Sequence, residues 1–449
     1  MVSPLRLFLL GSIFAITSAF QASLPSPPPS TRASTSLCIK LKMQSNNYMA
    51  ASCIDIAENA ERDVSSLYTW AADYGVQTAD CFELSSEVLF AGQDIFAITN
   101  QNLPANTPVV CVPKDLILSG NKARQELSAP EAERALKLSD HTSFYLFLKI
   151  LKEYELGDQS PWYSWLNSLP RFYSTAASLS AFCFSCLPPY ASKQGQAEKS
   201  RLKRFEAALD EIQFLSEQTK SNADLLKWAY NVVRTRYHEN DGGDYCIAPM
   251  ADYFNHGGTE TEVYISFDQE GNCYASTTRD VPAGQPLRIS YGDPTNPSQL
   301  LATYGFLDES SPGTYCKWIA DEASSELFNL GYPNKMLFYN DGNISNEVWD
   351  VLLYQELGKI SPEQQSAFYQ AHMTGDEATK SSYHQQYFPQ TLAVLQQHVS
   401  NILGILNELD FGKNVPGGRH PRLPLLLRHN DFVKQTFQLV QANLNSMSS

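Results

Sequence analysis

A change in the spacing of apolar residues most constrains how this chain can fold. Short apolar runs separated by Gly, Asn and Pro occur at 88–113 and again at 246–291, a pattern typical of strands and turns. Between them, at 123–236, apolar residues recur three and four positions apart, as in amphipathic helices. Helical spacing returns from Asn296 onward. This alternation predicts an α+β protein, in which a strand-rich domain is interrupted by a helical insertion and followed by a helical domain.

Local signals place some of these elements more closely. Apolar residues at helical spacing predict a helix over 67–74 that Gly75 ends. Asp140 and Asp224 precede two further helical patterns and are the expected N-caps. A short buried strand is expected to end at Pro113. One later helix should bury a single apolar face made of Leu392, Leu395, Val399, Ile402 and Leu406.

Composition bounds the class of protein and its partners. The chain has 449 residues, of which 43% are hydrophobic and 18% charged, enough for a buried core in about two domains. Its formal net charge of -15 argues against a nucleic-acid partner, because phosphate binding requires clustered Lys and Arg. We expect a monomer that binds a protein substrate.

The nine cysteines are spread over the whole chain, which is typical of reduced thiols and not of a disulfide framework. Cys183 and Cys186 have the CxxC spacing of zinc and redox sites. No second CxxC or Cys/His pair follows at zinc-finger distance. We therefore expect packed free thiols and no metal.

The first 50 residues have the composition of a targeting leader. Arg6 precedes an apolar stretch that ends in small residues near Ala19, which predicts a signal peptide over 1–19. Residues 20–50 are rich in Ser, Thr and Pro, and the first acidic residue of the chain is Asp55. This resembles the two-part leader of algae with secondary plastids, with Phe20 at the junction. The expected location is the plastid stroma, with no membrane segment in the mature chain; secretion or an endomembrane location is the alternative.

Two clusters follow or connect the predicted strands. "FAGQDIFA" (Phe90–Ala97) contains a Gly turn whose backbone amides can approach a ligand closely, although a plain hairpin has the same pattern. "CIAPMADYFNHGG" (Cys246–Gly258) leads from an apolar strand into Asn255 and His256. Asn and Gly tolerate positive φ, so this stretch suits a turn. In that turn, Asn255 and His256 would present hydrogen-bonding groups to a ligand.

A third cluster decides between these alternatives. "ISYGDPTNPSQLLATYGF" (Ile289–Phe306), together with "PMADYFNH" (Pro249–His256), resembles two signatures of SET-domain methyltransferases. "GDQSPWYSWLNSLPRFYST" (Gly157–Thr175) and "KWAYNVVRTRYH" (Lys227–His238) are similar to the inserted helical segment of one branch. That branch includes the Rubisco large-subunit lysine methyltransferase and the SET-type actin-histidine methyltransferase. The resemblance extends over most of the mature chain.

The resemblance implies S-adenosylmethionine as cofactor and assigns roles to particular residues. Arg236 would contact the cofactor carboxylate, Tyr291 would be the catalytic phenol, and Tyr304 and Phe306 would line the channel for the target side chain. Asp94 departs from the family, which usually has a second Gly at this position. The implied cofactor-binding residues are Gly92, Gln93, Asp94, Ile95, Phe96, Arg236, Asp252, Asn255, His256 and Tyr291.

The expected function is therefore protein-lysine N-methylation of a non-histone plastid protein such as Rubisco. A histidine methyltransferase and a catalytically degenerate SET module that binds a partner are the alternatives. The expected architecture is a split SET domain, a helical insertion and a C-terminal all-helical substrate-binding domain. The predicted boundaries are 60–122 and 237–312 for the SET domain, 123–236 for the insertion and 313–449 for the helical domain.

Overall fold

The computed structural model describes residues 53–89, 92–136, 140–258, 260–320, 323–414 and 419–448. The predicted leader, 1–50, lies outside these residues. The chain divides into two compact units. Unit 1 comprises the chain up to Glu87, Asp94–Arg171 and Phe205–Ile289, and unit 2 comprises Val88–Gln93, Phe172–Arg204 and Ser290–Ser449.

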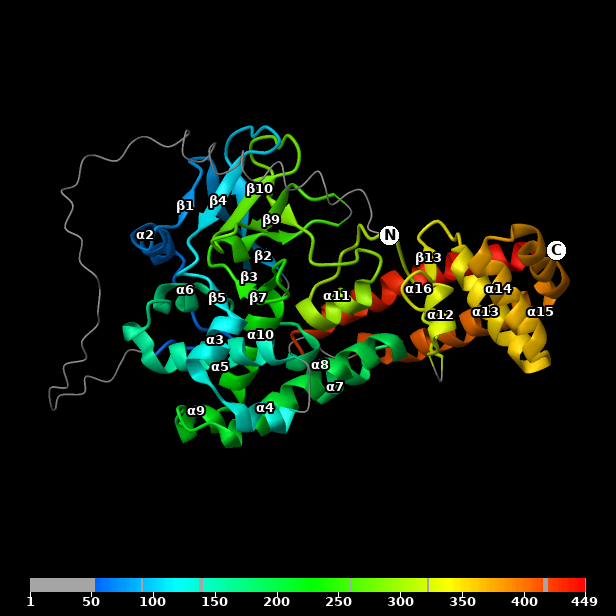
Figure 1. Cartoon of the computed structure of the whole chain (residues 1–449), viewed down its shortest axis with the longest axis horizontal. Coiled ribbons are helices and arrows are strands. Elements are labelled where there is room, and N and C mark those ends of the chain that lie inside the picture. The colour runs from blue at the N-terminus through cyan, green and yellow to red at the C-terminus, as the bar shows by residue number, and fades with distance from the viewer. Residues whose placement is uncertain are drawn as a thin grey trace. The chain divides into compact units, whose positions relative to one another are not determined.

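Unit 1 contains an antiparallel sheet that joins segments from both sides of the helical insertion (Figure 1). Its strand order is β1-β4-β10-β9, and Cys273 on β10 lies opposite Val112 on β4. The pairing joins a strand that precedes the predicted insertion to a strand that follows it. The four strands are β1 (Gln77–Thr78), β4 (Pro108–Val112), β10 (Cys273–Thr277) and β9 (Val263–Phe267).

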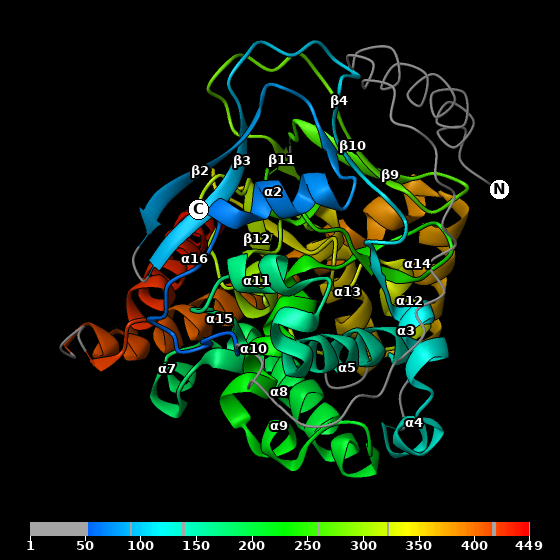
Figure 2. The ribbon, with the colours of Figure 1, turned by 90° about the vertical axis from the view of Figure 1, so that its left-hand side faces the viewer.

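Three smaller sheets complete the strands of unit 1. One sheet pairs β2 with β3, which lie side by side in Figure 2. Another sheet has the order β5-β7-β6, and the third pairs β11 with β8. Their bounds are β2 (Phe82–Leu89), β3 (Gly92–Thr99), β5 (Leu118–Ser119), β7 (Tyr245–Ile247), β6 (His238–Glu239), β8 (Asn255–His256) and β11 (Arg288–Ile289).

In unit 1, α5 packs against α3, α6 and α10, and its residues 143–151 are all buried. Phe144 and Phe147 of α5 contact Phe205, with ring centroids 5.2 and 5.5 Å apart, and Phe205 in turn contacts Tyr230 of α10. The helices are α2 (Ser65–Asp73), α3 (Gly120–Leu127), α4 (Pro130–Leu136), α5 (His141–Leu156), α6 (Tyr163–Ser168), α9 (Glu217–Ser221) and α10 (Ala223–Arg236).

Of the three predicted helix ends, one is confirmed, one lies at the predicted residue without the expected capping bond, and one is wrong. Gly75 follows α2 with φ +80°, as a helix-ending glycine should. Asp140 occupies the N-cap position of α5, but its side chain accepts from Ser143 Oγ and makes no capping bond to the backbone. The prediction for Asp224 was wrong, because Asn222 caps α10 by accepting from Leu225 N at 3.1 Å. Both residue types cap helices, so propensity alone does not choose between positions two residues apart.

Unit 2 is mainly helical, with a core between α13, α15 and α16 that includes Val351, Leu395, Val399 and Phe437. All five residues of the predicted apolar face on α15 are buried. The helices are α7 (Ala181–Ser185), α8 (Pro189–Ala208, which continues into unit 1), α11 (Pro297–Tyr304), α12 (Ser325–Asn329), α13 (Asn346–Ile360), α14 (Pro362–Thr374), α15 (Glu377–Glu408) and α16 (Leu423–Ser446).

The all-helical prediction for 313–449 was wrong in one respect. Two short antiparallel strands, β12 (Gly313–Tyr315) and β13 (Leu337–Tyr339), pair within this region. Three residues are too few to show an alternating pattern in the sequence. Gly313 permits the pairing, since a Cβ there would lie 2.6 Å from the Phe338 carbonyl oxygen.

The two units do not coincide with the predicted domain boundaries. Residues 172–204 belong to unit 2, although the sequence placed them in the insertion, and 290–312 belong to unit 2 as well. Short 3-10 turns occur in both units: η2 (Gly157–Gln159), η3 (Ala176–Ser178), η4 (Leu209–Glu211), η5 (Ala251–Tyr253) and η6 (Leu409–Asn414). A search of the described helices finds none with the length and apolar character needed to span a bilayer.

Candidate functional site: a polar cluster and an aromatic cluster

Asn255 and His256 form a strand, which corrects the predicted turn. They constitute β8, which pairs in parallel with β11, so that Asn255 lies opposite Arg288 and His256 opposite Ile289. Gly257 lets the two segments approach, because a Cβ there would lie 2.8 Å from the Arg288 Cβ. Both side chains on β8 remain partly exposed. The strand therefore presents them at fixed positions and does not merely reverse the chain.

The positive φ expected in this stretch occurs five residues earlier, at Met250. Its φ is +75°, and its side chain is fully buried. Such a backbone conformation is costly for a residue with a Cβ and persists only where the surrounding packing enforces it. Met250 immediately precedes the 3-10 turn η5 (Ala251–Tyr253), which leads into β8. The strained position therefore sets the direction in which the chain enters the Asn255–His256 strand.

Asp94 and Asn255 are joined by a side-chain hydrogen bond. The Asn255 Nδ2 donates to Asp94 Oδ2 at 2.7 Å. Asp94 lies on β3 and Asn255 on β8, so residues far apart in sequence meet in unit 1. The amide nitrogen of Asn255 is thereby engaged, which fixes the orientation of the amide and leaves its oxygen as the acceptor.

The rest of the predicted Gly-containing segment belongs to β3. Gly92 begins the strand, Ile95 is buried and Phe96 is partly buried. Residues 90 and 91, which would form the turn, lie outside the described residues. Gln93 is exposed, and it belongs with Gly92 to unit 2, whereas Asp94 begins the next segment of unit 1. Backbone contact between this segment and a cofactor stays a prediction.

Arg236 and Asp252 form a buried ion pair. Arg236 Nη1 donates to Asp252 Oδ2 at 2.9 Å and to the Asp252 carbonyl oxygen at 2.8 Å. The Nε1 of Trp165 donates to the same carboxylate oxygen at 3.0 Å. Burial raises the pKa of Asp252, against the opposing effects of Arg236 and Trp165. The guanidinium is thus held in one orientation by a carboxylate that lies away from water.

This geometry bears on the role expected for Asp252. Its side chain exposes no surface, whereas that of Arg236 exposes 10%. The Asp252 carboxylate is therefore enclosed, whereas a small part of the Arg236 side chain is accessible. The Asp252 side chain holds the Arg236 guanidinium in place, and contact between Asp252 and a cofactor stays a prediction. The sequence pattern showed an acid before Asn255 but not that the acid faces inward.

The three residues predicted to surround the target side chain form one aromatic cluster in unit 2. The rings of Tyr291 and Tyr304 have centroids 4.7 Å apart, and Phe306 lies 6.1 Å from Tyr291 and 6.3 Å from Tyr304. The Tyr304 hydroxyl donates to the Tyr291 carbonyl oxygen at 3.2 Å. All three side chains are partly exposed. The arrangement offers aromatic faces and a phenol at an accessible surface.

Gly305 allows Tyr304 and Phe306 to lie on the same cluster. It follows α11 with φ +78°, and its N–H donates the helix-ending hydrogen bonds to the carbonyl oxygens of Leu300 and Leu301. A Cβ at this position would lie 2.5 Å from the Ser174 carbonyl carbon and 2.6 Å from Thr175 N, both backbone atoms. The glycine of the Tyr-Gly-Phe sequence is therefore required by the backbone conformation and by the close approach of Ser174 and Thr175. Only glycine permits both the turn and the close approach.

Trp165 is the functional residue that sequence reasoning missed. It is fully buried and fixes the Asp252 carboxylate. Its segment resembled a family signature, but nothing in the pattern indicated which of its aromatic residues would meet Asp252. A donor that pairs with an acid 87 positions away has no local signal.

The cysteines and the other described acids and histidines give no indication of a metal centre. Cys183 and Cys186 are free and buried, as the packed-thiol interpretation predicted. Within the described ranges, no group of three or more His, Cys, Asp or Glu side chains is arranged to hold a metal ion.

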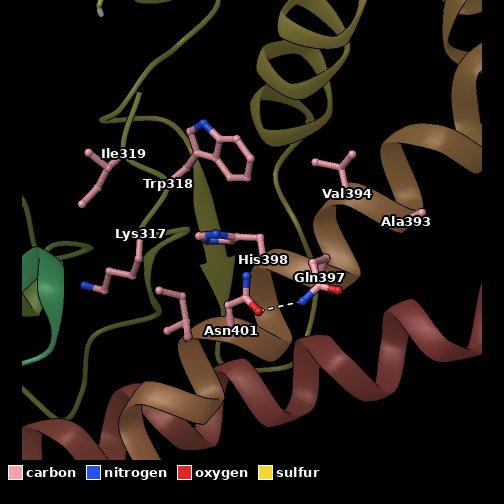
Figure 3. A pocket seen from close by; sticks show the side chains of 9 residues that line it. Lys317, Trp318, Ile319, Ala393, Val394, Gln397, His398 and Asn401 are labelled. Carbon is pink, nitrogen blue, oxygen red and sulfur yellow. Dashed lines mark hydrogen bonds between the residues drawn. The ribbon is translucent and has the colours of Figure 1, made fainter. Parts of the chain in front are cut away.

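A hollow of about 600 Å³ in unit 2 involves none of the predicted site residues (Figure 3). The His398 Nε2 lies at its wall and donates to the Cys316 carbonyl oxygen at 2.7 Å, and burial lowers the pKa of His398. Lys317 contributes its stem, while its Nζ donates to Ser298 Oγ at 2.6 Å. The hollow is mainly apolar, and its lining includes no residue predicted to bind a cofactor or a target side chain. Its lining is Lys317, Trp318, Ile319, Ala393, Val394, Gln397, His398, Asn401 and Ile402.

Solved structures of SET-domain proteins have a similar fold. The SET domain of LSMT bound to lysine and AdoHcy superimposes with a TM-score of 0.61 and 16% identity, covering 86% of this chain and 91% of that one. Rubisco LSMT bound to AdoMet gives 0.59 and 17%, covering 86% and 92%. This chain has the SET-domain fold. No protein-family model and no curated protein matches the sequence, so the SET-domain likeness rests on structure and on the short motifs.

Proposed function

We propose that this protein is an S-adenosylmethionine-dependent protein-lysine N-methyltransferase. One observation carries the proposal. Tyr291, Tyr304 and Phe306, predicted to surround the target side chain, form a single accessible aromatic cluster in a chain with the SET-domain fold. The LSMT structures with this fold were determined with AdoMet, AdoHcy, lysine or methyllysine bound.

The polar cluster of unit 1 consists of the Arg236–Asp252 ion pair and the Asp94–Asn255 hydrogen bond. Its charges fit such a cofactor. S-adenosylmethionine has a carboxylate, an ammonium, a sulfonium and an adenosine moiety. A guanidinium held by a buried acid, as Arg236 is held by Asp252, suits the carboxylate. The Asn255 amide oxygen and the β8 backbone suit the hydrogen-bonding edge of adenosine. When bound, the cofactor would supply a methyl group to the acceptor nitrogen, with the thioether as the leaving group.

The aromatic cluster suits a neutral amine. A lysine has a free pKa of about 10.4, so roughly one in 10³ is neutral at pH 7. Aromatic walls lower that pKa because they exclude water, and a nearby positive charge lowers it further. The Tyr291 hydroxyl can then accept a hydrogen bond from the amine and direct its lone pair, while Tyr304 and Phe306 exclude water. No carboxylate is needed at the amine.

The substrate is a non-histone plastid protein, with Rubisco as the first candidate, and the location is the plastid stroma. The leader composition at 1–50 supports the location. The fold of Rubisco LSMT supports the class of substrate. Fluorescence from a fusion of residues 1–55 should accumulate inside plastids when it is expressed in an alga with secondary plastids. Accumulation in the secretory route would contradict the location and leave the activity untouched.

Binding and transfer test the activity separately. Calorimetry should show that the purified protein binds S-adenosylmethionine, and absence of binding would refute the enzyme. Incubation with a plastid extract and methyl-labelled cofactor, followed by mass spectrometry, should find the label on a lysine. Label on histidine would establish the alternative acceptor, and binding without any transfer would support the non-catalytic module.

A further inference from the structure

Asp94 has an unusual environment for an acid near a proposed cofactor site. It is partly buried on β3, and its only interaction among the described residues is the 2.7 Å bond from the neutral amide of Asn255. No Lys, Arg or His of the described chain forms an ion pair with it. Aspartate is negatively charged at neutral pH, and a charge withdrawn from water gains from a nearby positive charge. Among the described residues, no ion pair supplies that charge to Asp94.

The position of Asp94 connects this charge to the cofactor. Its partner Asn255 belongs to the strand that we propose contacts adenosine, and its strand β3 contains the segment that resembles the SET cofactor loop. S-adenosylmethionine carries a positive sulfonium, whereas the product of methyl transfer is a neutral thioether. Coulombic attraction falls only as the inverse of distance, so a partly desolvated carboxylate distinguishes these ligands without touching the sulfur.

We propose that Asp94 makes the site selective for the cationic cofactor over its neutral product and also positions the Asn255 amide. This inference rests on the proposed function, because it assumes that the polar cluster binds S-adenosylmethionine. Preference for the substrate cofactor lessens product inhibition, which otherwise increases as the thioether accumulates. Asp94 is a positioning and selectivity residue and forms no bond in the reaction.

Two substitutions separate the charge from the hydrogen bond. Asp94→Asn keeps an oxygen that can accept from Asn255 but removes the charge, whereas Asp94→Ala removes both. Glu83→Gln is the matched control, because it removes one negative charge from an exposed position on β2, the strand paired with β3. Calorimetry with the full chain would measure Kd for S-adenosylmethionine, for S-adenosylhomocysteine and for sinefungin, whose amine is positively charged.

For Asp94→Asn we expect Kd for S-adenosylmethionine and sinefungin to rise about fivefold to tenfold and Kd for S-adenosylhomocysteine to change less than twofold. The effect should shrink at 1 M salt. Asp94→Ala should weaken all three ligands, and Glu83→Gln none. Equal weakening of charged and neutral ligands by Asp94→Asn, or no change, would overturn the inference and leave the enzyme standing. Failure of the unmodified protein to bind any ligand would instead refute the proposed function.

Discussion

The polar cluster of unit 1 and the aromatic cluster of unit 2 are held together by different forces. In unit 1, Asp94, Asn255, Arg236 and Asp252 are fixed by an ion pair and directed hydrogen bonds between side chains. In unit 2, the rings of the aromatic cluster are fixed by contact with one another and by the close approach of backbone at Gly305. The polar cluster therefore depends on charge, and the aromatic cluster depends on how closely its rings and the backbone at Gly305 pack. Changes of charge should therefore damage unit 1 selectively, and changes of volume should damage the aromatic cluster.

The largest effect is expected at the buried ion pair of unit 1. Arg236→Leu leaves the Asp252 carboxylate buried without its cation, which should cost about 4 kcal/mol of unfolding free energy. Urea unfolding measures this loss. The double variant Arg236→Leu/Asp252→Leu should recover most of it, because no charge remains buried. A loss below about 1 kcal/mol in the single variant would show that charge does not organise this cluster.

A change of volume tests unit 2. Gly305→Ala should cost about 3 kcal/mol, since φ is +78° and the new Cβ meets the backbone of Ser174 and Thr175. Gly404→Ala is the control in the same unit, because this exposed glycine of α15 has no atom within 4 Å of an added Cβ and should gain about 1 kcal/mol. Similar changes in thermal unfolding for both variants would show that the close backbone approach at Gly305 does not control the stability of this region.

In unit 2, outside the aromatic cluster, stability should depend on pH through the buried acid Asp350. Burial raises the pKa of Asp350, but hydrogen bonds from His384 and Lys380 outweigh it, so the pKa lies below 3.8. The stability that Asp350 contributes is therefore present above about pH 4 and lost as pH falls through the folded pKa. Asp350→Asn should cost about 2 kcal/mol at pH 7, where the charged hydrogen bonds are intact. This cost should shrink as the pH falls below about 4.

Unfolding measured between pH 3 and 7 tests this pH dependence. Parallel curves for Asp350→Asn and the unmodified protein would contradict the assigned ion pairs. Methyl transfer by the variant at pH 7 should be unaffected while it stays folded, because the aromatic cluster does not depend on this charge.

The smallest change concerns one hydroxyl. Tyr291→Phe keeps the ring and its contacts with Tyr304 and Phe306 but removes the hydroxyl that we propose directs the amine. Methyl transfer should slow about tenfold, equivalent to about 1.4 kcal/mol, while Kd for the cofactor changes less than twofold. Tyr339→Phe, on β13 of the same unit, is the control and should transfer methyl groups normally. Normal turnover by Tyr291→Phe would remove the catalytic role of the phenol.

Much of the fold could be predicted because its signals are local. The apolar face of α15, the strand before Pro113 and the helix that ends at Gly75 each follow from side-chain spacing or from one turn residue. The wrong predictions about strands have a common cause. The β12–β13 pair and β8 are two or three residues long, and such short strands exist only through their partners, so periodicity cannot reveal them.

The sequence by itself determined which residue types were available to the two clusters. Tyr291, Tyr304 and Phe306 could be selected because their segment resembles a family signature, and Arg236 because its segment resembles another. Tertiary structure alone decided that Asp94 meets Asn255, that Asp252 faces inward to Arg236 and that Trp165 donates to Asp252. Hydrogen bonds between distant residues leave no periodic trace, because their geometry depends on how strands and helices pack and not on neighbouring side chains.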